Sequence, residues 1–125
     1  MSRARQAAAA VAGLRIAYGA ALAIAPARTT RSWLGDDGAR PAAKVALRGL
    51  GAREIALHAG AFRAALVDAP VTPWLLASIG GDCSDIAATF GAGARNLPDG
   101  APVKTLAVAG GSAVVSALVL AALDR

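Results

Sequence analysis

Side chains capable of acid–base chemistry lie in otherwise apolar stretches of this chain. Residues 47–60 read LRGLGAREIALHAG, and residues 78–89 carry an aspartate pair. Carboxylates held close together titrate separately, which generates one acid and one base, and arginines can hold an anionic group. The candidate acid–base residues are Asp82, Asp85, Glu54 and His58, and the candidate substrate-binding residues are Arg48, Arg53, Arg15 and Ser78.

The same residues do not predict a metal or a cofactor. Asp82 and Asp85 have the DxxD spacing with which prenyl-group and CDP-alcohol enzymes hold Mg²⁺ and a diphosphate, but the second aspartate motif of those enzymes is absent. Glu54 and His58 are four apart, which differs from the Glu-x-x-His spacing of di-iron bundles. Cys83 is the single cysteine, so neither an intramolecular disulfide nor a cysteine-based zinc site can form.

Composition indicates a membrane environment. The 125 residues, one domain by length, are 56% hydrophobic, against roughly 45–50% in ordinary soluble domains. The mean hydropathy is +0.52. The net charge of +5 comes from scattered arginines and lysines, without the clustered basic stripe of a nucleic-acid-binding protein. We therefore expect membrane lipids as partners, with the basic residues near anionic headgroups, and no nucleic acid.

Four apolar segments predict four helices, at about residues 7–25, 42–67, 72–91 and 102–123. The stretch Leu106–Leu123 is 18 residues long without a charge, which is typical of a spanning helix. Small residues recur along the last helix and permit close contact with another helix, at Thr105, Ala109, Ser112 and Ser116. The predicted fold is an all-α, four-helix transmembrane bundle over residues 1–125, placed as a multi-pass protein in the cell membrane.

The segments between the helices carry turn and interface residues. Residues 26–43 form the longest predicted connection, with a turn at Gly35–Gly38 and Pro41 in the first turn of the next helix. The first helix also has the basic start and small-residue end of a signal peptide, but Arg15 in its middle favours a retained membrane helix. The positive-inside rule weakly favours a cytoplasmic position for the first and third loops and an external position for both termini.

Helical periodicity places the polar side chains on stripes. Lys44, Arg48, Gly51, Glu54 and His58 share one face of the second helix, and Arg53 points almost the opposite way. The third helix has its own narrow stripe, at Ser78, Asp82, Asp85 and Thr89. Charged groups inside a membrane pair with one another or face a cavity. The predicted cluster pairs three cations (Arg15, Arg48 and Arg53) with three anions (Glu54, Asp82 and Asp85), and His58 is its titrating member.

The step Gly51-Ala52-Arg53-Glu54 and the pair Asp82 and Asp85 also carry a resemblance. Over most of its length, the chain resembles small four-helix integral membrane proteins to which no activity is assigned. The resemblance implies a membrane location and leaves the activity open.

Three functions fit these residues. The first is a structural or interaction subunit of a membrane assembly, as a homo-oligomer or within a complex, in which the cluster fixes the helices. The second is a membrane-embedded enzyme of the isomerase, cyclase or hydrolase type, using the carboxylates on a lipophilic small molecule. The third is a proton- or ion-coupled transport element, because intramembrane Asp, Glu and His are common relay residues. A filled network favours the first function and a cavity at the cluster favours the second.

Overall fold

The computed structural model describes residues 1–91 and 93–125, which form helices and turns but no strand. The predicted all-α class is therefore confirmed. Four long helices dominate: α1 (Arg3–Ile24), α4 (Pro41–Leu66), α5 (Thr72–Gly91) and α6 (Ala101–Leu123). The short elements are α2 (Pro26–Thr29), α3 (Arg31–Leu34) and the 3₁₀ helices η1 (Gly35–Ala39) and η2 (Ala94–Asn96).

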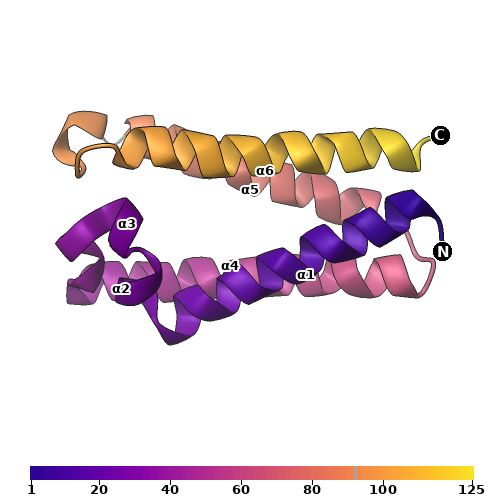
Figure 1. The fold of residues 1–125 in the computed structure, drawn as a ribbon, viewed down its shortest axis with the longest axis horizontal. Coiled ribbons are helices and arrows are strands. Elements are labelled where there is room, and N and C mark those ends of the chain that lie inside the picture. The colour runs from indigo at the N-terminus through magenta and orange to yellow at the C-terminus, as the bar shows by residue number, and fades with distance from the viewer. Residues whose placement is uncertain (92) are drawn as a thin grey trace.

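The long helices lie in two antiparallel pairs (Figure 1). The first pair is α1 with α4, and the second pair is α5 with α6; contact within each pair is far more extensive than contact between the pairs. A short turn from α4 to α5 joins them at the end that also holds both chain termini, which we call the terminal end. The opposite end, which holds α2, α3, η1 and η2, is the loop end.

The predicted connection at residues 26–43 is largely helical. Pro26 occupies the first position of α2, where its missing N–H is tolerated. Thr30 is buried and its Oγ1 donates to the carbonyl oxygen of Pro26 at 2.8 Å. Gly38 lies against Thr30 with no room for a Cβ atom. These contacts fold the segment into α2, α3 and η1, and Pro41 then begins α4 as expected from the sequence.

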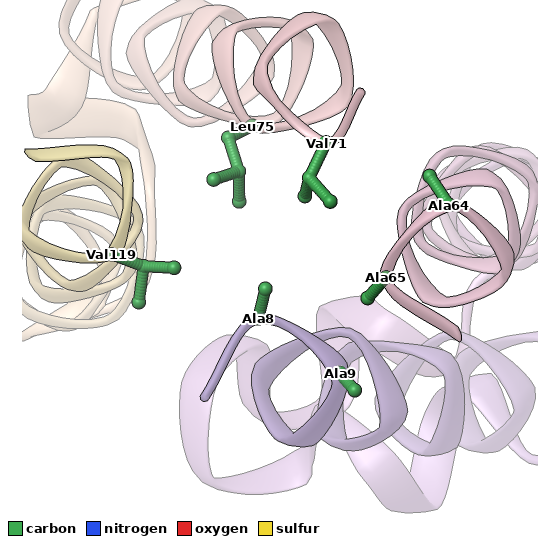
Figure 2. Packing of buried hydrophobic residues seen from close by; sticks show 7 residues of the cluster. All are labelled: Ala8, Ala9, Ala64, Ala65, Val71, Leu75 and Val119. Carbon is green, nitrogen blue, oxygen red and sulfur yellow. The ribbon is translucent and has the colours of Figure 1, made fainter. Parts of the chain in front are cut away.

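The apolar core lies at the terminal end. Figure 2 shows small and branched side chains from α1, α4, α5, α6 and the turn before α5 around one space: Ala8, Ala9, Ala64, Ala65, Val71, Leu75 and Val119. Four of these seven residues are alanines, so the helix backbones approach closely. The core therefore holds the two pairs together at this end only.

Arg5 ties the start of α1 to the end of α4. Its guanidinium donates to the carbonyl oxygens of Ala64, Ala65 and Ala69 at 2.6, 3.2 and 2.7 Å. It also lies 3.3 Å from the Asp68 carboxylate. Carbonyls at a helix C-terminus lack intrahelical partners, so a basic side chain there satisfies them and complements the helix dipole.

Two glycines mark the place where α1 and α4 cross. A Cβ atom at Gly51 would lie 2.5 Å from the carbonyl oxygen of Gly19, and one at Gly19 would lie 2.7 Å from that of Gly51. Only hydrogen side chains permit this approach. The α1 backbone thus fills the space beside Gly51.

Two helices, α1 and α6, are long and apolar enough to cross a membrane by length and composition. Only 22% and 17% of their apolar windows is buried, which is unlike the core helix of a soluble protein. Among the described residues α4 and α5 do not meet this criterion, because α4 carries six ionisable side chains and α5 carries two aspartates. The predicted four-span bundle is therefore not confirmed, and two of its four helices meet this criterion.

Candidate functional site

Arg15 lies at the centre of the polar side chains and reaches three other helices. Its Nε donates to Glu54 Oε2 on α4 at 2.6 Å. Its two terminal nitrogens form a fork with the Asp82 carboxylate on α5, at 2.9 and 3.2 Å, and Nη1 also bonds Ser112 Oγ on α6. A bidentate Arg–carboxylate contact fixes geometry as well as charge. All four long helices thus meet at one side chain.

Arg53 makes the second fork. Its Nη1 and Nη2 donate to the two oxygens of Asp85 at 3.1 and 2.7 Å, and Nη2 lies 3.5 Å from Glu54 Oε1. Glu54 is thereby held between both arginines, with its side chain 3% exposed. Arg53 adjoins Glu54 in sequence and projects about 100° away from it around the helix, and its length lets it reach Asp85 on α5. We call these five side chains the ion-pair cluster: Arg15, Arg53, Glu54, Asp82 and Asp85.

His58 and Ser78 extend the cluster toward the terminal end. His58 Nδ1 lies 2.8 Å from the carbonyl oxygen of Glu54, which can only accept, so Nδ1 carries the proton of the neutral ring. Nε2 then accepts from Ser78 Oγ on α5 at 3.0 Å. His58 and Ser78 are both buried. Their hydrogen bond is another link between the two helix pairs.

Arg48 does not join the cluster. Its side chain is exposed, and its Nε donates to the carbonyl oxygen of Ala23 at the end of α1, at 3.3 Å. The structure thus brings together seven of the eight predicted site residues and leaves Arg48 outside. The cluster therefore has two guanidinium groups and three carboxylates, whereas the sequence predicts three guanidinium groups and three carboxylates.

A cavity of about 640 Å³ lies between the two helix pairs, next to the ion-pair cluster. Its walls include Leu50, Ala88, Val108 and Ala109, and its floor includes Arg15, Glu54, Asp82, Asp85 and Ser112. Toward the loop end it is lined by polar and aromatic side chains, namely Thr29, Ser32, Trp33, Lys104 and Thr105. The volume lies within the usual range for small-molecule sites. The cavity thus combines apolar walls with a charged floor.

Sequence reasoning missed three residues that line this cavity. Ser112 was assigned to a face for helix contact, yet it bonds Arg15. Tyr18 lies one turn after Arg15, a spacing that brings it to the same side of α1. Trp33 lies in the segment predicted as the longest connection, and its Nε1 donates to Thr105 Oγ1 at 3.0 Å. The helical position of Tyr18 was a usable signal, whereas the tertiary contact of Trp33 had none.

Among residues 1–91 and 93–125, no group of three or more His, Cys, Asp or Glu side chains is placed to hold a metal ion. The arginines lie between the carboxylates and keep them apart. Comparison with family models, with curated proteins and with solved structures finds no match to this chain.

Proposed function

We propose that this chain is a small integral membrane protein whose four long helices all cross the bilayer. The observation that carries the proposal is the reversal of polarity: large apolar side chains point outward while charged ones meet inside. Leu14, Val45 and Leu118 are 73%, 72% and 66% exposed, whereas Glu54 and Asp82 are each 2% exposed. Such extensive exposed apolar surface marks an interaction or membrane surface. Helices of 20–26 residues measure roughly 30–39 Å, which suits a hydrocarbon core of about 30 Å.

In this setting the ion-pair cluster has a structural role. Burial of apolar surface does not drive helices together in lipid, so packing and polar contacts must do so. The forks Arg15–Asp82 and Arg53–Asp85 both connect the first pair to the second pair. We infer that the protein serves as a structural or interaction subunit of a membrane assembly, with its exposed apolar faces available to lipid or to a partner subunit.

The arrangement of α6 bears on how such an assembly forms. Thr105, Ala109 and Ser116 are buried within the chain, so the small-residue face is occupied and cannot serve a second copy. The large apolar side chains on the other faces of α6 are exposed, for example Val103, Val114 and Leu118. A contact with another subunit would use these faces.

Alkaline carbonate extraction tests the membrane proposal. The protein should stay in the membrane pellet, and release into the soluble fraction would contradict it. N-terminal sequencing of the same material should show that α1 is retained. Cleavage after the small residues near Ala25 would remove Arg15 and leave Glu54 and Asp82 without their shared partner.

The cavity favours a second candidate function, a membrane-embedded site for a lipophilic small molecule. Asp85 and Glu54 lie on its floor and could act there as acid and base. A purely structural network needs no empty space beside it. The test is retention of a lipophilic molecule by the purified protein, read by native mass spectrometry.

A further inference from the structure

The charges of the ion-pair cluster do not balance. Arg15 and Arg53 face three carboxylates, and Arg48 is turned away to the end of α1. Lys104, the other cation of the lining, bonds the carbonyl oxygen of Ser32. It lies eight residues from Ser112 along α6, or about 12 Å. With neutral His58, the ion-pair cluster therefore carries one excess negative charge.

Asp85 is the acceptor that remains accessible. Its side chain is 33% exposed, whereas those of Glu54 and Asp82 are 3% exposed. An ionised carboxylate has about four lone-pair sites, and Arg53 occupies two of them. Thr89 bonds the backbone carbonyl of Asp85 and leaves the carboxylate free. Asp85 can therefore accept hydrogen bonds from a molecule in the cavity.

The rest of the lining suits a cation with an apolar body. Tyr18 and Trp33 contribute aromatic rings, and ammonium groups bind favourably over such rings. Leu50 and Val108 contribute apolar wall. At about 30 Å³ for a water-sized group, a cavity of about 640 Å³ holds roughly 20 non-hydrogen atoms.

We propose that the cavity binds a lipophilic molecule carrying one positive charge, with its ammonium group at Asp85. The proposal rests on the second candidate function and names its ligand class. A single cation restores neutrality to the ion-pair cluster, and uncompensated charge is costly inside a membrane. Protonation of His58 would also neutralise the cluster, and in that case a ligand cation has no advantage over a neutral ligand.

Three probes that share the rigid adamantane cage distinguish a cationic ligand from a neutral or anionic one: aminoadamantane, adamantanol and adamantane carboxylate. Trp33 reports occupancy by its fluorescence in a Trp74→Phe background, since the chain has only these two tryptophans. The purified full chain in detergent should bind aminoadamantane at least about tenfold more tightly than the other two. Asp85→Asn brings the cluster to two charges of each sign, so this preference should fall to within about twofold. Asp85→Glu should retain the preference.

Asp99→Asn is the matched control, because it removes an exposed carboxylate in the segment before α6 and should leave all three affinities as they are. Equal affinities of the three probes for the parent protein would overturn the cationic ligand and leave the cavity as a site. Binding of none of them would overturn the ligand site itself. A preference for aminoadamantane that survives Asp85→Asn would overturn the assignment of the ammonium group to Asp85.

Discussion

Arg15 is the residue on which the contact between the helix pairs depends most. It is the only charged side chain between Arg5 and Arg28, and it contacts one polar side chain on each of α4, α5 and α6. Its own side chain is 15% exposed, and those of Glu54 and Asp82 are 3% exposed. Loss of one member of a buried ion pair leaves the other member uncompensated, which costs more than the pair itself contributes.

A double-mutant cycle between Arg15 and Asp82 measures this dependence. Arg15→Ala and Asp82→Ala should each lower the free energy of unfolding by on the order of 3 kcal/mol. The double variant should lose clearly less than the sum, because neither charge is then left alone. Unfolding in mixed detergent and SDS micelles gives these values.

Arg48→Ala provides the matched control in the same cycle. Arg48 and Asp82 do not touch, since Arg48 bonds the end of α1. Their changes should add to within about 0.5 kcal/mol. Additivity for Arg15 with Asp82, or coupling for Arg48 with Asp82, would contradict the geometry of the cluster.

At the scale of single helices, the contact of α1 with α4 depends on Gly19 and Gly51. Gly49 provides a matched comparison with Gly51, since it lies on the same helix with open space around its Cβ position. Gly49→Ala should raise stability by up to about 1 kcal/mol through helix propensity. Gly51→Ala should instead lower it, because the added methyl group meets the Gly19 carbonyl oxygen. Thermal unfolding in detergent measures the direction of both stability changes. An increase in stability on Gly51→Ala would contradict the close crossing of α1 and α4.

At the scale of the whole molecule, the space between the two pairs changes in character along its length. Small apolar side chains fill it at the terminal end (Figure 2), ion pairs cross it in the middle, and toward the loop end it contains the cavity. At the loop end, the Trp33–Thr105 bond and the contact of Lys104 with Ser32 connect α3 to α6. The cavity is therefore bounded by contacts at both ends.

Ligand retention should distinguish a binding site from a purely structural network. In the binding-site hypothesis, the parent protein carries a lipophilic molecule through purification, and Asp85→Asn loses it. In the structural hypothesis, the parent carries only lipid and Asp85→Asn melts several degrees lower, because Arg53 loses its fork. Native mass spectrometry and thermal unfolding in the same detergent separate the two outcomes.

Helical periodicity was sufficient to predict the all-α class and to place Glu54 and His58 on one stripe of α4. In the structure His58 contacts Ser78 directly, and Glu54 shares Arg15 with Asp82. It was not sufficient for Arg48 and Arg53 of α4. A helical projection gives the direction of the Cβ atom, whereas an arginine places its charge several bonds further away. Arg53 therefore enters the cluster from a different face of α4, and Arg48 leaves it for a free carbonyl oxygen at the end of α1. Long-range contacts such as Trp33 with Thr105 leave no local pattern in the sequence.

The position of Arg15 in the first long helix has a consequence for biosynthesis. Glu54 follows Arg15 by 39 residues and Asp82 by 67, so Arg15 is synthesised before either of its partners. An unpaired arginine at the centre of a span opposes insertion by about 2.5–3.5 kcal/mol. On the proposed topology, α1 therefore enters the bilayer most readily together with α4, as a pair that already contains Glu54. The order of translation thus determines when the membrane can accept the first helix.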